Sequence, residues 1–316
     1  MLTLTGKTYL CGLMQTIRYL VLFLGITLVF SSCGNFEKLR KKGTDEQKYQ
    51  AALTYYKKGD YDKAVLLFEE LKPLLKGSDQ QELATFYEAY CNYHLQQYEV
   101  ASFQFKRFYE TFGRSENAEE ALYMSSYASY RASMPYYLDQ ASTLTAMDAM
   151  QSFINTYPQS KFVEEASKII KESRKKLEKK SYERAKLYYK TSPTNLQNYR
   201  SAVYAVNNFK KEFPDSDYNE ELAFLQVQSQ YDFAQNSLYT KQKERYDDVV
   251  KYYQEFVDTY PNSKLLKKAE RFYEVSVKKS ADLAEQERLA KAAQKDKEKN
   301  NQPANTGRLG SGSSSN

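Results

Sequence analysis

Apolar and polar residues alternate along most of the chain with the spacing expected of paired amphipathic helices. Between Ala52 and Phe68, small and aromatic residues stand three or four positions apart on both sides of the dipeptide Gly59-Asp60. Spacings of three and four place side chains on one face of a helix. Glycine tolerates the backbone of a tight turn. The pattern therefore predicts two antiparallel helices joined by a short turn.

A short string recurs at the ends of four predicted helices. It has the form Phe-x-x-x-aromatic-Pro/Gly-x-Ser, and its copies begin at Phe108, Phe153, Phe209 and Phe256. The Phe and the aromatic residue share one side of a last helical turn. The Pro or Gly then ends the helix, and the Ser is placed to cap the next one. With this string as a guide, the sequence predicts five helix pairs, at about residues 45–78, 82–115, 119–160, 180–216 and 222–263.

The spacings within each pair are those of a tetratricopeptide repeat (TPR), a unit of about 34 residues. One pair cannot bury its own apolar face, so the pairs must stack. The predicted fold is all-α, a five-repeat TPR superhelix over residues 45–280 with a further C-terminal helix from about residue 264. We expect longer hairpin turns in the third to fifth pairs. Residues 281–316 are predicted to form a charged helical extension and a disordered tail from residue 300.

The N-terminus has a different pattern. Lys7 and Arg18 precede an apolar run from Tyr19 to Phe30, and the first 33 residues contain no acidic residue. The run is shorter than the about 20 residues that cross a bilayer, and it fits a secretory signal. The following Ser-Ser-Cys-Gly resembles a bacterial lipobox. The resemblance implies a signal peptide over residues 1–32, lipidation of Cys33 and a short basic tether over residues 33–44. An ordinary signal with a free cysteine nearby is the alternative.

Composition restricts the possible functions. The 316 residues carry 46 Lys+Arg against 40 Asp+Glu, a formal net charge of +6, which is too mild to predict a nucleic-acid partner. Tyr, at 30, outnumbers Gly and Pro, at 11 and 7, which argues against an all-β fold. Acidic pairs such as Glu119-Glu120 are expected to be solvated charge.

The few cysteine and histidine residues argue against chemistry at an active site. The single His rules out a cluster of histidines, and no Cys-x-x-Cys or Gly-rich phosphate loop is present. With Cys11 in the signal and Cys33 lipidated, Cys91 has no disulfide partner and is expected to pack in the core. We therefore predict no catalytic residue, metal site or cofactor, and no enzyme.

The first helices of the pairs are predicted to line the inner wall of the solenoid, where TPR proteins usually bind extended peptides. The repeat positions that usually face this groove select the following residues: Tyr49, Leu53, Tyr56, Lys57, Phe86, Tyr90, Tyr93, His94, Tyr123, Tyr127, Tyr130 and Arg131. Tyrosine offers a flat apolar face and a hydroxyl at low entropic cost. The prediction is a ladder of phenols with a basic edge at Lys57, His94 and Arg131. Packing of individual rings between helices is the alternative.

The lipobox, the five repeats and the recurring Phe string together resemble the BamD family of outer-membrane lipoproteins, over about residues 28–280. The resemblance implies a lipid-anchored, non-enzymatic scaffold on the periplasmic side of the outer membrane. It implies that the N-terminal repeats contact the C-terminal signal strand of unfolded outer-membrane proteins. It also implies that the C-terminal repeats dock on the barrel-forming subunit of the assembly machinery.

Two other envelope roles use similar repeats. Sugar-binding TPR lipoproteins of the starch-utilisation type are generally longer and favour Trp for stacking, whereas this chain has no Trp. A coordinator of cell division would localise to the septum. The first alternative predicts tight binding of an oligosaccharide, and neither predicts co-purification with an integral β-barrel protein.

Overall fold

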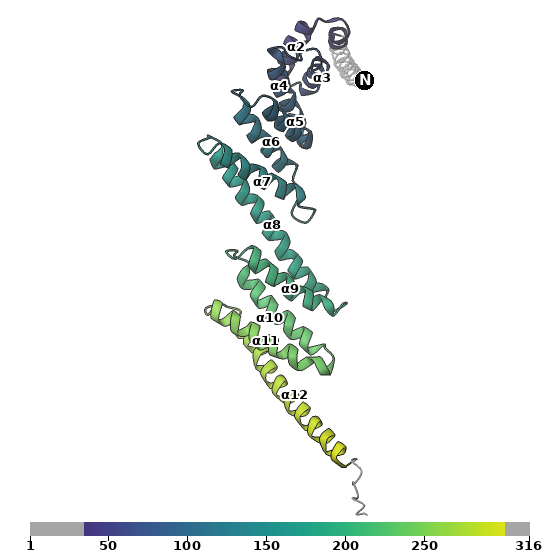
Figure 1. The fold of residues 1–316 in the computed structure, drawn as a ribbon, viewed down its shortest axis with the longest axis vertical. Coiled ribbons are helices and arrows are strands. Elements are labelled where there is room, and N and C mark those ends of the chain that lie inside the picture. Colours follow the sequence, from purple (N-terminus) through teal and green to yellow (C-terminus); the bar gives the residue numbers. More distant parts are fainter. Residues whose placement is uncertain (1–34, 301–316) are drawn as a thin grey trace, which may run out of the picture. The chain divides into compact units, whose positions relative to one another are not determined.

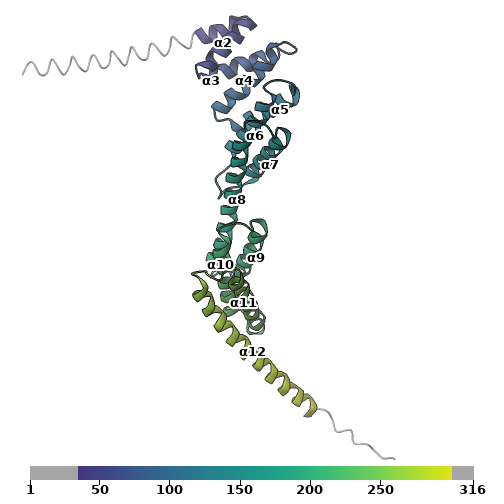
Figure 2. The same cartoon turned by 90° about the vertical axis from the view of Figure 1, so that its left-hand side faces the viewer.

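The fold was taken from a computed structural model, which describes residues 35–300 (Figures 1 and 2). The regular elements of these residues are helices and no strand occurs among them, which confirms the all-α prediction. The labelled helices are α2 (Asp45–Lys57), α3 (Tyr61–Leu71), α4 (Gln80–His94), α5 (Tyr98–Thr111), α6 (Ala118–Ala132), α7 (Ala141–Thr156), α8 (Val163–Thr191), α9 (Gln197–Glu212), α10 (Asn219–Gln235), α11 (Tyr239–Thr259) and α12 (Leu266–Asn300). The signal, Cys33 and the tail lie outside the described residues. Compact packing divides the chain after Arg174 into an N-terminal and a C-terminal unit.

The N-terminal unit contains three helix pairs, α2/α3, α4/α5 and α6/α7, each packed on the next. Thr44 begins α2 with a capping box, in which its hydroxyl accepts from the Gln47 amide and the Gln47 side chain accepts from the Thr44 amide. Gly59, at a φ of 79°, makes the turn to α3. Ala52 and Ala64 are fully buried, so the two helices approach closely. The turn at Gly59 is the one that the repeat pattern predicted.

Residues 35–42, predicted as part of a tether, are helical. Phe36 is buried in the core of the first repeat, and its ring meets Tyr55 edge-on with centroids 5.6 Å apart. Arg40 forms an ion pair with Glu70 at 2.6 Å. The prediction missed this packing because Phe36 and Leu39 are two apolar residues in a basic run, too few to show periodicity.

The recurring string forms the predicted helix ends. Its four Phe side chains are almost fully buried, and each backbone carbonyl accepts from the amide of the aromatic residue four positions on, at 2.7 to 2.9 Å. The Ser does not cap the helix itself. Its hydroxyl accepts from the amide two residues on, as at Ser160 and Ser263. The same hydroxyls donate to Glu119 and Glu220, both at 2.6 Å. Each of these hydrogen bonds joins the segment after the second helix of a pair to the first helix of the same pair.

In the C-terminal unit, α9, α10, α11 and α12 pack in sequence order. Helix α8 contributes to the cores of both units: Ala166 and Ile169 lie in the N-terminal core, and Tyr182 and Ala185 in the C-terminal one. The sequence left residues 161–179 unassigned because lysine and glutamate dominate them. On α12, Leu283 is the last buried residue of the described part, and the described side chains beyond it are exposed or half-buried.

Candidate peptide-binding surface

Side chains from the first helices of three successive pairs form an unbroken row of rings in the N-terminal unit. The ring of Tyr56 on α2 lies 6.3 Å from that of His94 on α4, and His94 lies 5.6 Å from Tyr93. Tyr93 in turn lies 6.0 Å from Tyr127 on α6, which is 6.2 Å from Tyr130. We call this face the aromatic surface; its residues are Tyr56, Tyr90, Tyr93, His94, Tyr127, Tyr130 and Arg131.

Three of the twelve predicted residues belong to the core. Tyr49, Phe86 and Tyr123 expose only 5%, 5% and 7% of their surface. They occupy the same position in successive first helices, and this position faces neighbouring helices. Phe86, for example, packs on Phe108 at a centroid distance of 5.1 Å. Leu53 is half-buried against the core of the first repeat. We leave the three core rings, and Leu53 because it has no ring, out of the aromatic surface.

The predicted basic edge consists of residues in the last turns of α2, α4 and α6. Lys57 is exposed there. Arg131 donates to the hydroxyls of Tyr98 at 2.7 Å and Tyr93 at 3.2 Å. His94 stacks on Tyr61 with centroids 4.2 Å apart and planes at 9°. Burial lowers the pKa of His94, so at neutral pH the imidazole is uncharged and the positive charge of this edge comes from Lys57 and Arg131.

Carboxylates of the next first helix hold two of the phenol hydroxyls. Tyr90 donates to Glu120, and Tyr130 donates to Glu172 at 2.9 Å. Burial, followed by the hydrogen bond to Glu172, raises the pKa of Tyr130 to about 12. Tyr90 and Tyr130 are therefore neutral at neutral pH, and their hydroxyls are engaged by carboxylates within the fold.

The same contacts correct the prediction that the pair Glu119-Glu120 is solvated charge. Glu119 accepts from Ser160 and Glu120 accepts from Tyr90, so both carboxylates have partners within the fold. Adjacent residues on a helix point to different sides, and here each side meets a different neighbour. Sequence spacing alone gave no sign of these partners, which lie 30 and 41 residues away.

Three tyrosines that the groove positions did not select also contribute. Tyr61 stacks on His94, Tyr98 binds Arg131, and Tyr87 lies 4.7 Å from Tyr56 between ring centroids. Tyr61 and Tyr98 are the first residues of second helices. Their repetition at that position was visible in the sequence and could have added them to the predicted binding residues.

The remaining chemistry of the described residues is sparse. Cys91 is fully buried in the core of the first repeat, and burial raises the pKa of its thiol to about 12. Within residues 35–300 no group of three or more His, Cys, Asp or Glu side chains is placed to hold a metal ion. Among the same residues, no helix combines the length and apolarity needed to span a membrane.

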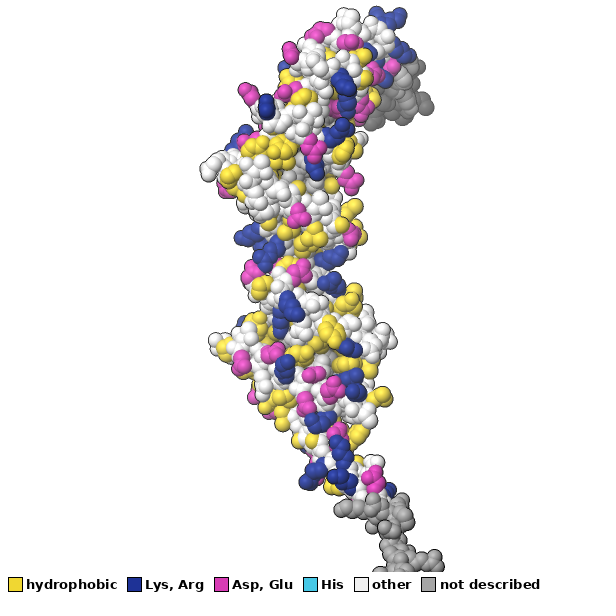
Figure 3. All heavy atoms as spheres, viewed as in Figure 1, with side chains coloured by type: hydrophobic (Ala, Val, Ile, Leu, Met, Phe, Trp, Pro, Cys, Tyr) yellow, Lys and Arg dark blue, Asp and Glu magenta, His cyan; other side chains and the backbone are white. Residues whose placement is uncertain are grey.

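Positive and negative side chains are interspersed on the face drawn in Figure 3, with apolar side chains between them. This face has no continuous stripe of Lys and Arg of the kind that tracks a phosphate backbone. The charge pattern there is that of a mixed polar surface, as the modest net charge of +6 predicts.

Stacked antiparallel helix pairs with a row of side chains from their first helices define the described chain as a TPR-like solenoid. Residues 41–195, just under half of the chain, match the model of the YfiO family, described as outer membrane lipoprotein. The match supports this family, and it covers the residues that form the aromatic surface.

Two other comparisons add little. No curated protein matches the chain. Among solved structures, a chain from work on the computational design of self-assembling cyclic homooligomers is 14% identical and covers 85% of this chain and 98% of its own. Its TM-score is 0.18, so this similarity carries no argument.

Proposed function

We propose that this protein is a BamD-type scaffold of outer-membrane protein assembly. In this proposal Cys33 carries the lipid anchor that holds the chain on the periplasmic face of the outer membrane. The N-terminal unit receives an extended segment of an unfolded outer-membrane protein. The C-terminal repeats dock on the barrel-forming subunit, and the protein promotes folding and insertion without catalysing a reaction.

The observation that carries the proposal is the unbroken aromatic surface within residues that match an outer membrane lipoprotein family. Side chains on one face of an extended strand recur about every 6.6 Å. Successive rings from Tyr93 to Tyr130 lie 6.0 and 6.2 Å apart, close to that repeat. Strands of membrane barrels alternate apolar and polar residues, with aromatic side chains near the membrane interfaces. Such a strand has the spacing to place its apolar side chains on successive rings.

Charge supports one orientation of the bound segment. Arg131 is held by two phenol hydroxyls and forms no ion pair in the described residues. A guanidinium that is fixed in place and lacks a carboxylate partner favours an incoming carboxylate. The C-terminal carboxylate of a barrel protein would satisfy it, with the preceding aromatic residue on Tyr127 or Tyr93.

Peptide binding tests the surface directly. The probe is a fluorescently labelled Ser-Tyr-Thr-Tyr-Ser-Phe peptide with a free C-terminus, and the readout is fluorescence anisotropy with the full-length chain. We expect Tyr93→Ala and Tyr127→Ala together to raise the Kd at least tenfold while helicity by circular dichroism stays unchanged. Tyr90 is left intact because its ring packs on Phe105 at 4.9 Å. Unchanged affinity would assign these rings to packing.

The matched control is Tyr137→Ala, in the exposed loop between α6 and α7, which should leave the Kd unchanged. The assembly role has its own test. The protein purified from membranes in mild detergent should retain an integral β-barrel protein, identified by mass spectrometry. A purification that retains none, or tight oligosaccharide binding in calorimetry, would replace assembly with another envelope role.

A further inference from the structure

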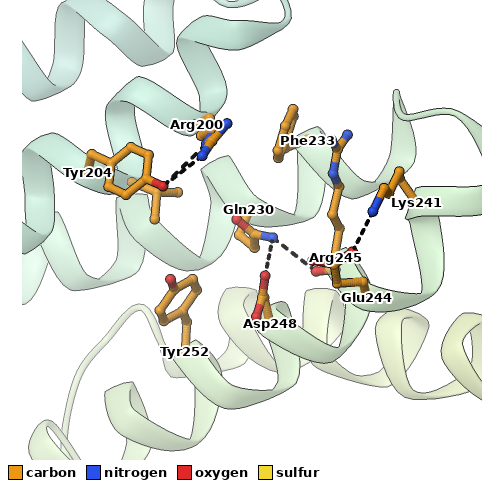
Figure 4. Close-up of a pocket in the computed structure, with 10 residues that line it drawn as sticks. Arg200, Tyr204, Gln230, Phe233, Lys241, Glu244, Arg245, Asp248 and Tyr252 are labelled. Carbon is orange, nitrogen blue, oxygen red and sulfur yellow. Dashed lines mark hydrogen bonds and ion pairs between the residues drawn. The ribbon is translucent and has the colours of Figure 1, made fainter.

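The C-terminal unit has a polar pocket of about 380 Å³ between α9, α10 and α11 (Figure 4). Its lining includes three cationic side chains, Arg200, Lys241 and Arg245, and two carboxylates, Glu244 and Asp248. The volume suits an amino-acid side chain or the end of a peptide. None of these residues belongs to the aromatic surface.

The Arg245 guanidinium is held in place by its neighbours. It lies over the ring of Phe233, with its central carbon 3.8 Å from the ring centroid, and it donates to the hydroxyl of Ser237. Phe233 is buried, so the ring is a fixed platform. Stacking and one hydrogen bond leave most of the five guanidinium donors unused. They remain for a ligand in the pocket.

Arg200 is positioned in a similar way on α9. Its guanidinium donates to the hydroxyl of Tyr204, one turn along the helix, at 3.0 and 3.3 Å. Figure 4 shows Arg200 and Tyr204 on one wall of the pocket and Arg245 on another. Burial lowers the pKa of Arg245, the nearby Glu244 carboxylate opposes this shift, and the charge of Arg200 lowers the pKa by a smaller amount, so the two guanidiniums are close enough to interact.

Neither guanidinium forms an ion pair with a carboxylate of the described residues. Asp248 instead accepts from the Gln230 amide at 3.2 Å, and Glu244 pairs with Lys241 at 3.2 Å. The lining thus has one more cation than anions, and its two arginines are held by aromatic side chains. A bound anion would gain charge-assisted hydrogen bonds from both guanidiniums.

We propose that this pocket binds a carboxylate of a polypeptide, either its C-terminus or an acidic side chain, through Arg200 and Arg245. The exposed ring of Tyr204 at the rim offers a surface for the neighbouring residue of that polypeptide. A second peptide-binding site follows, separate from the aromatic surface and independent of the role proposed for it.

The test observes the two guanidiniums directly. Arginine Nε–Hε NMR signals of the full-length chain in detergent are assigned with Arg200→Lys and Arg245→Lys. Three probes without aromatic residues are titrated: acetyl-Ala-Ser-Ala-Leu with a free carboxylate, the same peptide as an amide, and an amidated peptide with an internal Glu. Sodium acetate and inorganic phosphate are titrated separately.

We expect saturable shifts of both signals with at least one carboxylate peptide, at a concentration tenfold or more below that needed for acetate, and none with the plain amide. The free-carboxylate and internal-Glu peptides separate a chain terminus from an acidic side chain. Arg245→Gln should abolish the shift at Arg200, and Arg200→Gln, at an exposed position, should abolish it at Arg245. The control Arg288→Gln on α12 should change neither.

Absence of shifts with every carboxylate peptide would overturn the proposal. Acetate or phosphate acting at the same concentration as the peptides would also overturn it, because the pocket would then take any small anion. The probes lack aromatic residues and are detected in the C-terminal unit, so this result does not depend on the Tyr93 and Tyr127 experiment.

Discussion

The third and fifth repeats hold their helices with the same contacts. In each, a buried Phe stands one turn before an aromatic helix end, at Phe153 and Phe256. In each, a Ser hydroxyl donates to a Glu in the first turn of the first helix. The next Glu along accepts from a tyrosine of the preceding repeat, as Glu221 does from Tyr182 at 2.7 Å. The N-terminal and C-terminal units thus share one set of packing devices.

The units differ where the scaffold presents side chains to a ligand. The N-terminal unit presents tyrosine rings in a row, whereas the C-terminal unit presents a pocket with two arginines that form no ion pair among the described residues. A buried site differs too. Lys72 pairs with Glu88 at 2.6 Å. In the C-terminal unit a Lys and a Gln have the same separation in sequence, and there Lys210 donates to the neutral Gln226 at 2.7 Å. The two units therefore share their packing contacts but differ in their exposed side chains and at some buried polar positions.

The largest expected effect comes from removing the buried Phe of either unit. Phe153→Ala and Phe256→Ala should each lower the free energy of unfolding by about 3 to 5 kcal/mol, because each deletes a fully packed ring. Urea unfolding followed by circular dichroism measures the change. Phe103→Ala, at a side chain that is 61% exposed, is the control and should change it little. A small effect in one unit alone would show that the two strings are not equivalent.

A smaller effect is expected from the Ser–Glu hydrogen bond. Ser160→Ala and Ser263→Ala should each cost about 1 to 2 kcal/mol, since each leaves a half-buried carboxylate without its donor. The same unfolding measurement applies. Glu119→Ala combined with Ser160→Ala should cost less than the sum of the two single changes. Additive costs would mean that the bond contributes nothing.

The smallest effect concerns the buried Glu88, whose counterpart is Gln226. Burial raises the pKa of Glu88 above its ordinary value of 4.5, with Lys72 opposing this shift. The native state then binds more protons than the unfolded chain above pH 4.5, so stability falls as pH rises through the folded pKa. Glu88→Gln should remove that slope, so its stability relative to the wild type should rise as the pH increases from 4.5 through the folded pKa of Glu88. Unfolding at stepped pH measures it.

A control for this effect is Glu99→Gln, an exposed carboxylate on α5, which should leave the slope as it is in the wild type. A slope that persists in Glu88→Gln would assign the pH dependence to other groups. In the wild type the Gln104 side-chain amide donates to the Glu88 carboxylate at 2.8 Å. If the Glu88→Gln variant lost this hydrogen bond, it would be less stable than the wild type at every pH.

The sequence predicted the helix pairs well because their signals are local. A Phe four residues before an aromatic residue and a Pro or Gly sets a helix end by short-range geometry, and all four copies form one. The row from Tyr56 to Tyr130 also followed from repeat positions. Periodicity could not show which of these positions face solvent. Tyr49, Phe86 and Tyr123 turned out to be core residues, since that depends on the neighbouring helices.

Other features were lost in charged stretches. The first half of α8 and residues 35–42 each bury only a few side chains, such as Ile169 and Phe36, among many lysines and glutamates. Such sparse apolar residues give no clear helical period. The partners of Glu119 and the pocket around Arg245 depend on contacts between segments far apart in the chain. No spacing within one helix encodes them.

Cys91 gives the molecule a built-in reporter. Its sulfur is inaccessible and its pKa is about 12, so alkylation by iodoacetamide requires the first repeat to open. The labelling rate in native buffer, divided by the rate for an unfolded thiol, then gives the population of the open state without denaturant. It would reveal how often the end of the solenoid frays while the rest stays intact.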